Sequence, residues 1–445
     1  MIERPRRKTA VFIARAESVQ DRHLFLFAAA WVVTGGLALQ LVILPYVLPF
    51  AHAGHGLVAN TDGPGYYITA VALAETIQMD GFGAWWFFKD RTNDYIVAVS
   101  SLFYLITPEP WILLPLSGVQ FGITVVAIRR VLAIASASAG VALASILPFF
   151  LFPSFVMIWG QPHKDLNAGL GLAVTLYALA AAGFTIRHRV TWLVGAAGAG
   201  LGILWLSRPY AVMLVAAAAV VFAVAASLSR QCRRGRLVSV VGAMLGCAAL
   251  GQWVPSVAPA RPEQVEVYGF ISRACEPPTS RVDSVLYTVC ALRQGFVYAG
   301  TEASSTSGYD YDVQLRSAMD FVRYLPRAVA VATLEPLPQR WGTERTTVGR
   351  LASLFVPIEM SAAYMCFALA LLFGRRLLAR PIVWAIAGFC ITYSAIFAVV
   401  ITQVGTLYRT RAFAFAILIA TALACALSSL RPVTAGAGPL PHGRV

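Results

Sequence analysis

The sequence is poor in charged residues, and lysine is especially rare. Only 13% of its 445 residues are Asp, Glu, Lys or Arg, whereas 58% are hydrophobic, and the mean hydropathy is +0.69. Lysine occurs at Lys8, Lys89 and Lys164 alone. So few charges could not cover this much apolar surface in water, so a soluble fold is excluded. The composition predicts an all-α polytopic membrane protein.

The sequence also lacks the motifs of common soluble enzymes. It has no glycine-rich phosphate loop, no zinc-binding spacing and no nucleophile elbow. No internal repeat is visible, which weighs against many transporter folds. The net charge of +14 comes from short basic clusters between apolar runs. That pattern is typical of cytoplasmic loops facing an anionic leaflet, so no nucleic-acid partner is expected.

The alternation of apolar runs and basic clusters predicts about ten transmembrane helices, with both termini in the cytoplasm. The first run, at about 24–50, is too long for the core of a signal peptide and is predicted to be a retained span. Every short basic cluster but one, Arg409 with Arg411, then lies inside. The later runs lie at 111–128, through Pro148 and Pro153, at 166–184, at 192–206, before Arg230, and at 237–254, 351–373, 382–401 and after 411.

The chain divides into five predicted segments. In the long polar segment, Cys275 and Cys290 are expected to form a disulfide, which would close a loop of about 15 residues and stabilise it by roughly 3 kcal/mol. Moderately apolar pieces with paired tryptophans predict interfacial helices at 67–106. The segments are a basic cytoplasmic N-terminus at 1–23, a seven-span core at 24–253 with a first outer loop at 51–110, an extracytoplasmic loop at 254–350, three C-terminal spans at 351–430, and a disordered cytoplasmic tail at 431–445.

This topology places ionisable residues from four separate loops at one outer surface. Such groups are costly near hydrocarbon, so function or pairing is the default interpretation. The residues are Asp62, His163, Lys164, Asp165, Arg208, Arg409 and Arg411.

Each of these residues also has a simpler interpretation. Asp62, followed by Gly-Pro-Gly, is a good turn former and helix N-cap. Lys164 and Asp165 could form a local ion pair. His163 could be an interfacial polar residue. Arg208 could extend to lipid headgroups, and Arg409 and Arg411 could bind lipid phosphate without specificity. Spacing alone leaves these alternatives open.

The order of these features resembles the GT-C glycosyltransferases that use polyprenyl-phosphate-linked sugars, such as protein O-mannosyltransferases and the aminoarabinose transferase acting on lipid A. In that superfamily an acidic residue follows the first span, in a loop that carries interfacial helices. Asp62 and residues 67–106 match these features, although no second acid adjoins Asp62. A seven-span core followed by a variable periplasmic insertion is also similar. Three stretches look like those of membrane proteins from bacterial exopolysaccharide clusters: Pro162-His163-Lys164-Asp165, Arg208-Pro209-Tyr210 and Gly405-Thr406-Leu407-Tyr408-Arg409-Thr410-Arg411.

The resemblance implies an inverting glycosyltransferase of the bacterial inner membrane, active in cell-surface polysaccharide biosynthesis. It would move a sugar from a polyprenyl-phosphate donor to a glycan or lipid acceptor on the extracytoplasmic face, with Asp62 as the catalytic base. A polysaccharide polymerase or ligase, and a non-enzymatic transporter of lipid-linked sugars, are the alternatives. Dependence on a divalent cation is left open. The expected substrate- and phosphate-binding residues are Tyr66, Tyr67, His163, Lys164, Asp165, Arg208, Tyr210, Tyr408, Arg409 and Arg411.

Overall fold

The helical, multi-pass character that the composition predicts is confirmed by a computed structural model. Within its described residues the chain has no β-strand, and two isolated bridges are its only extended pairings. Seven helices there are long and apolar enough to cross a membrane, or eight if one bent pair counts as a single span. The described residues are 19–87, 94–186, 188–253, 275, 281–302, 308–341 and 347–429.

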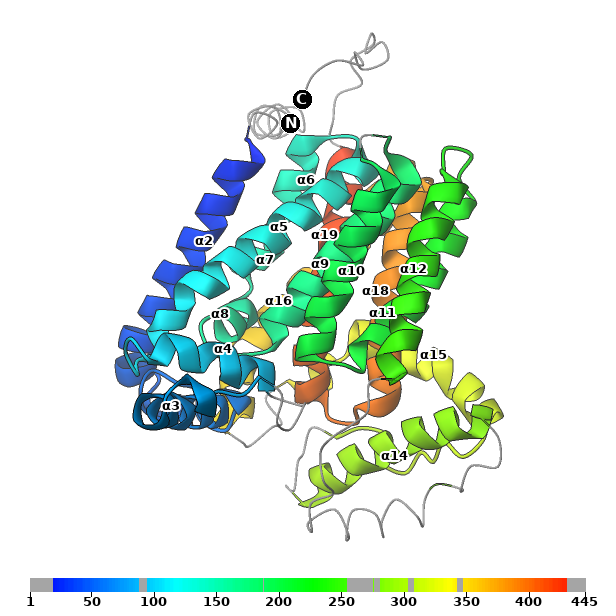
Figure 1. The fold of residues 1–445 in the computed structure, drawn as a ribbon. Helices are drawn as coiled ribbons and strands as arrows, with labels where there is room; N and C mark the ends of the chain where they lie inside the picture. Colours follow the sequence, from blue (N-terminus) through cyan, green and yellow to red (C-terminus); the bar gives the residue numbers. More distant parts are fainter. Residues whose placement is uncertain are drawn as a thin grey trace.

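The long helical segments of the described chain run between the two ends of a bundle (Figure 1). The most enclosed is α9, whose most apolar stretch is 94% buried. Its small residues allow close packing: a Cβ on Gly171 would lie 2.6 Å from the carbonyl oxygen of Gly200 in α10. The segments are α2 (Asp21–Ala38) with its continuation η1 (Leu39–Val47), α5 (Leu114–Ser136), α9 (Asp165–Phe184), α10 (Val190–Ser207), α11 (Ala211–Ser227), α12 (Arg234–Trp253), α16 (Thr347–Phe373), α18 (Pro381–Val400) and α19 (Val404–Ser428).

Helix α5 continues beyond the end predicted for it. The span expected at 111–128 was to stop before Arg129 and Arg130, but the helix runs on to Ser136. Both arginines pair with Asp21 at the start of α2: Arg130 Nε lies 2.7 Å from a carboxylate oxygen, and Arg129 forms an ion pair with the same side chain. Because the Asp21 carboxylate compensates part of their charge within the protein, these arginines need not mark a loop.

The next apolar run is broken rather than continuous. It contains α6 (Ala139–Ser145), α7 (Pro148–Leu151) and α8 (Pro153–Trp159), and the chain bends by 71° before Pro153. A proline lacks a backbone N–H and disfavours helical geometry in the residue before it, so a break at this point is expected. Figure 1 shows α6 near one end of the bundle and α8 near the other.

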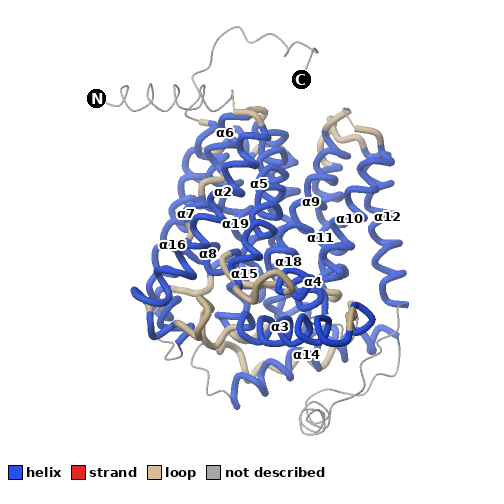
Figure 2. The backbone as a smooth tube through the Cα atoms, turned by 60° about the vertical axis from the view of Figure 1, so that its left-hand side comes forward, coloured by secondary structure: helices blue, strands red, loops and turns tan. Residues whose placement is uncertain are grey.

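The first outer loop folds into helices that lie across one end of the bundle, away from the start of α2 (Figures 1 and 2). The first of them begins at Asp62, five residues before the predicted start. Tyr67 and Tyr104 pack together in a small apolar core, with ring centroids 5.5 Å apart. The elements of the loop are η2 (Pro49–Ala51), α3 (Asp62–Asp80), η3 (Phe82–Ala84), α4 (Asp94–Tyr104) and η4 (Pro110–Leu113).

The long polar segment contributes two helices, α14 (Arg281–Glu302) and α15 (Ala318–Leu334), and both views place α14 at the same end as α3. A disulfide joins Cys275 to Cys290, the pair expected from the sequence. The short elements η5 (Pro338–Arg340) and α17 (Arg375–Leu378) complete the fold. Of the predicted N-terminal segment at 1–23, residues 19–23 are described. The predicted tail at 431–445 lies outside the described residues.

Candidate functional site

Asp62 opens helix α3 but does not cap it. Thr61 occupies the N-cap position with an extended backbone, and no side chain caps the helix through a hydrogen bond. The Asp62 carboxylate instead lies 2.9 Å from Nη2 of Arg409. Its side chain is 40% exposed, so a ligand arriving at this end of the bundle can reach it. The helix-cap alternative therefore does not account for Asp62.

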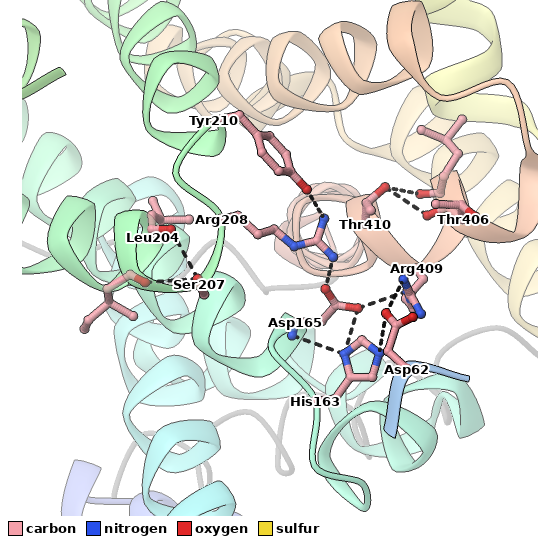
Figure 3. Close-up of polar contacts among 12 residues, drawn as sticks. Asp62, His163, Asp165, Leu204, Ser207, Arg208, Tyr210, Thr406, Arg409 and Thr410 are labelled. Atoms are coloured by element: carbon pink, nitrogen blue, oxygen red, sulfur yellow. Dashed lines mark hydrogen bonds and ion pairs between the residues drawn. The ribbon is translucent and has the colours of Figure 1, made fainter. Parts of the chain in front are cut away.

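Asp165, the first residue of α9, is the buried counterpart of Asp62. Its side chain is 3% exposed. One oxygen forms an ion pair with Arg208, and the other lies 3.3 Å from Nε of Arg409 and 3.1 Å from Nδ1 of His163. These contacts join the start of α9 to the turn between α10 and α11 and to α19, so Asp165 does more than pair locally. Figure 3 shows this carboxylate at the centre of the group.

His163 lies between the two carboxylates. Its Nε2 is 3.8 Å from Oδ2 of Asp62, its Nδ1 faces Asp165, and its side chain is 5% exposed. The ring of Tyr66 stands edge-on to the imidazole, with centroids 6.4 Å apart. His163 therefore couples the exposed carboxylate to the buried one (Figure 3).

The loop that carries His163 is tied to the loop that leads to Asp62. Gln161 accepts a hydrogen bond from the backbone of Val58 and donates one to the carbonyl of Gly56, both at 3.0 Å. Gln40, in η1, donates to the carbonyl of Gly160 at 2.7 Å. These amide contacts fix two segments about 100 residues apart in the sequence, so the positions of His163 and Asp62 are set together.

Arg208 is an internal cation rather than a ligand for lipid headgroups. Its side chain is 2% exposed, in the turn between α10 and α11. Burial opposes its charge, but the adjacent Asp165 carboxylate more than compensates and raises the pKa of Arg208 above its ordinary value. Nη1 also donates to the hydroxyl of Tyr210 at 3.3 Å. Arg208 therefore supplies a permanent positive charge beneath the site.

Lys164 and Tyr66 lie at the edge of the same group. The ammonium of Lys164 is 5.9 Å from the centroid of the Tyr66 ring, within range of a cation–π contact. Burial, followed by the positive charge of Arg208, lowers the pKa of Lys164. Burial and the nearby Asp62 carboxylate raise the pKa of Tyr66, which keeps its hydroxyl neutral. Tyr66 can thus donate a hydrogen bond at any physiological pH.

A small cavity lies beside this group, between α9, α18 and α19. Asp165 and Arg409 line it close to the starts of α9 and α19. Leu172 lies seven residues further along α9, so the lining runs about 10 Å into the bundle. The full lining is Asp165, Ala168, Gly169, Leu172, Tyr393, Arg409, Thr410 and Phe413. Tyr393 was missed by the sequence analysis because it lies in the apolar span α18, where no neighbouring residue marks it.

Three of the predicted binding residues lie elsewhere. Arg411 is 1% exposed and donates to the carbonyls of Val331, Ala332 and Glu335 at the end of α15. The hydroxyl of Tyr408 donates to Glu359 of α16, and Tyr67 belongs to the small core with Tyr104. This corrects the assignment of Arg411 and Tyr408 to phosphate binding, because both terminal nitrogens of the buried Arg411 donate to backbone carbonyls and the hydroxyl of the half-buried Tyr408 donates to Glu359.

The segment before Arg409 is held by the long outer segment. The backbone N–H of Tyr309 donates to the carbonyl of Thr402 at 2.9 Å, and Gly308 forms a bridge with Gln403. Arg293 is fully buried and donates to the carbonyls of Asp310 and Val399 at 2.6 and 2.7 Å. The outer segment thus fixes the start of α19, which positions Arg409.

We call the group formed by Asp62, His163, Lys164, Asp165, Arg208 and Arg409 the charged cluster. It sets two carboxylates against two guanidinium groups and one ammonium, so it suits an anionic ligand. In the described part of the chain, no three His, Cys, Asp or Glu side chains are arranged to hold a metal ion. Comparisons of the chain with family models, curated proteins and solved structures gave no significant match.

Proposed function

We propose that this protein is a GT-C-like glycosyltransferase that moves a sugar from a polyprenyl-phosphate donor to a glycan or lipid acceptor. The observation that carries the proposal is the pairing of the exposed Asp62 with Arg409 inside a cluster of excess positive charge. An exposed carboxylate can act on an acceptor hydroxyl, while the cations beside it can hold a phosphate. Both needs of this reaction are met by one group of residues.

In the proposed reaction Asp62 is the general base. The acceptor oxygen gives its proton to Asp62 and attacks the anomeric carbon of the donor sugar. The bond from that carbon to the phosphate oxygen breaks, and the lipid phosphate leaves with the bonding electrons. Attack from the face opposite the phosphate inverts the anomeric centre. General-base assistance of this kind accelerates reactions by about 10²–10⁴-fold.

The cations have two different roles in this proposal. Arg409 is 30% exposed, so its planar guanidinium can engage the phosphate oxygens directly. Arg208 is buried and acts through its charge and through Asp165, which it holds in place. Asp165 in turn lies 3.3 Å from Arg409 and keeps that side chain at the site when a phosphate competes with Asp62 for it. Negative charge developing on the leaving phosphate would be stabilised by this preorganised group.

The proposal also includes a complete topology. With the bent pair as one span, α11 and α12 would extend the eight candidate spans to ten. Both termini would then lie in the cytoplasm of a bacterium, with the charged cluster and α14 on the outer side of the inner membrane. The basic residues near the start of α12, Arg233, Arg234 and Arg236, lie on the side that the positive-inside rule would make cytoplasmic.

The test is transfer of radiolabelled sugar from a polyprenyl-phosphate donor by Asp62→Asn in proteoliposomes. Transfer should fall by about 10³-fold, within the range for loss of a general base, while expression and thermal stability stay at wild-type levels. Asp80→Asn is the matched control, since Asp80 is an exposed residue at the other end of the same helix. Retained transfer in Asp62→Asn would remove Asp62 from the mechanism.

A polysaccharide polymerase or ligase is the second candidate, because Arg208 and Arg409 could serve it without a carboxylate base. That enzyme would keep its activity in Asp62→Asn and lose it in Arg409→Met. Asp62→Asn therefore separates the two functions: it abolishes transfer by the proposed glycosyltransferase and leaves a polymerase or ligase active.

A further inference from the structure

A second polar group lies at the same end of the bundle, on another face of α9. Asn167 is 3% exposed, and its side-chain oxygen accepts hydrogen bonds from the hydroxyl of Tyr95 at 3.2 Å and from the amide of Gln120 at 2.7 Å. These residues come from α4, α5 and α9. Asn167 follows Asp165 by two residues, so its side chain leaves the helix about 200° around the axis from Asp165 and about 3 Å further along. We call Tyr95, Gln120 and Asn167 the amide cluster.

The amide cluster contains polar groups that are not used in the hydrogen bonds between its own members. A carboxamide offers an acceptor oxygen and two N–H donors. In the described part of the chain, the amide nitrogen of Asn167 donates to no neighbour, and the amide oxygen of Gln120 accepts from none. Tyr95 and Gln120 are half-buried, so the hydroxyl of Tyr95 and the amide of Gln120 are within reach of a ligand, with the buried Asn167 behind them. Within the described residues, donors and acceptors are therefore presented side by side, and their hydrogen-bond partners are uncharged.

Aromatic rings extend from the amide cluster. The ring of Phe87 lies 6.1 Å from that of Tyr95 and 5.9 Å from that of Trp85, both in edge-on arrangements. Trp85 is fixed by a hydrogen bond from its indole N–H to the carbonyl of Ala98 at 3.2 Å. The three rings are half-buried; Trp85 and Phe87 follow η3, and Tyr95 lies at the start of α4. They give the amide cluster an apolar wall of fixed orientation.

We propose that the amide cluster and these rings bind the uncharged saccharide of the acceptor. A sugar presents hydroxyl groups, which both donate and accept hydrogen bonds, and C–H faces, which pack on aromatic rings. Neutral amides and a phenol match the hydroxyls, and the rings match the faces. Among the described residues no cation pairs with the amide cluster, so a phosphate would gain little there, whereas the charged cluster on the other side of α9 carries three cations.

This inference rests on the proposed glycosyl transfer and adds the chemical class of the acceptor to it. The start of α9 separates the two clusters, with Asp165 facing the donor phosphate and Asn167 facing the acceptor sugar. An acceptor hydroxyl would reach Asp62 by passing around this helix end. The acceptor would thus be a saccharide, and a lipid acceptor would be bound through its sugar.

The test is binding of the full chain, in lipid nanodiscs, to an array of immobilised mono- and oligosaccharides. Wild type is expected to bind a subset of them. Tyr95→Phe, which removes a single hydroxyl, and Asn167→Leu should each weaken that binding by about tenfold, as expected for lost hydrogen bonds at a largely buried site. Tyr46→Phe is the matched control, because Tyr46 is 79% exposed on η1, far along the chain from the amide cluster.

Asp62→Asn distinguishes this inference from the proposed function. It should keep wild-type saccharide binding while losing transfer. The inference is overturned if wild type binds no saccharide on the array, or if folded Tyr95→Phe and Asn167→Leu bind as wild type does. The proposed function fails separately, if Asp62→Asn still transfers sugar.

Discussion

Arg409 and Arg411 lie two residues apart in α19, yet they belong to regions of opposite character. Arg409 is 30% exposed and lies between two carboxylates, one of which reaches solvent. Arg411 is 1% exposed, and its guanidinium satisfies three carbonyl groups at the end of α15. Two residues turn the helix by about 200°, so the side chains leave α19 on different faces. The partly exposed guanidinium of Arg409 can bind a ligand, whereas the buried guanidinium of Arg411 donates to backbone carbonyls and stabilises the fold.

The largest effect should come from removing the carboxylate that joins both arginines of the charged cluster. Asp165→Asn leaves Arg208 and Arg409 without their buried partner, and loss of one member of a buried ion pair costs about 3–5 kcal/mol. The free energy of unfolding, measured by titration with sodium dodecyl sulfate, should fall by this amount. Asp80→Asn supplies the exposed control. An unchanged unfolding free energy would mean that the buried carboxylate does not hold the two arginines.

Arg411→Met tests whether the second arginine stabilises the fold rather than binding the donor. Three carbonyls at the end of α15 lose their donor, so the free energy of unfolding should fall by about 3 kcal/mol. Donor affinity in the surviving folded protein should stay at the wild-type level, because Arg411 does not face the charged cluster. A selective loss of donor affinity with unchanged stability would reverse the roles assigned to the two arginines.

A smaller effect is expected from pH. Lys164 is charged below its pKa, and because burial lowers that pKa, it loses its charge at a lower pH than an exposed lysine does. Donor affinity should therefore fall as pH rises through this lowered pKa, by roughly fivefold if the ammonium contributes about 1 kcal/mol. Lys164→Arg, which stays charged, should remove the fall. A pH profile that is identical in both proteins would exclude Lys164 from donor binding.

The sequence predicted which loops meet, but not which way each side chain points. Alternating apolar runs and basic clusters placed Asp62, His163, Arg208 and Arg409 at one surface, and the structure brings them together. That success depends on hydropathy and charge, which are visible in the sequence. Residues 403–411 were interpreted as a loop, whereas α19 begins at Val404, so Arg409 and Arg411 lie within the helix on different faces. Orientation around a helix depends on where the helix starts, and the apolar pattern alone did not give that residue.

The contacts that hold the charged cluster in place were also hidden in the sequence. Gln161 and Gln40 tie two loops together through backbone groups, and nothing in their local sequence sets them apart from other polar residues. Tyr393 lies in an apolar span, and Asn167 follows Asp165 as one more polar residue at a helix start. Their roles come from neighbours on other helices and loops rather than from adjacent residues, so a single sequence gives no signal for them.

The most direct test of this account is the dissociation constant for a polyprenyl-phosphate sugar, measured in nanodiscs for Arg409→Met against wild type. Arg376→Met, at an exposed position at the other end of the bundle, is the matched control. The account predicts at least a tenfold higher dissociation constant for Arg409→Met, as expected when a charge-assisted contact worth about 1.4 kcal/mol or more is lost, with no change for the control. An equal affinity in all three proteins would contradict a phosphate site at the charged cluster.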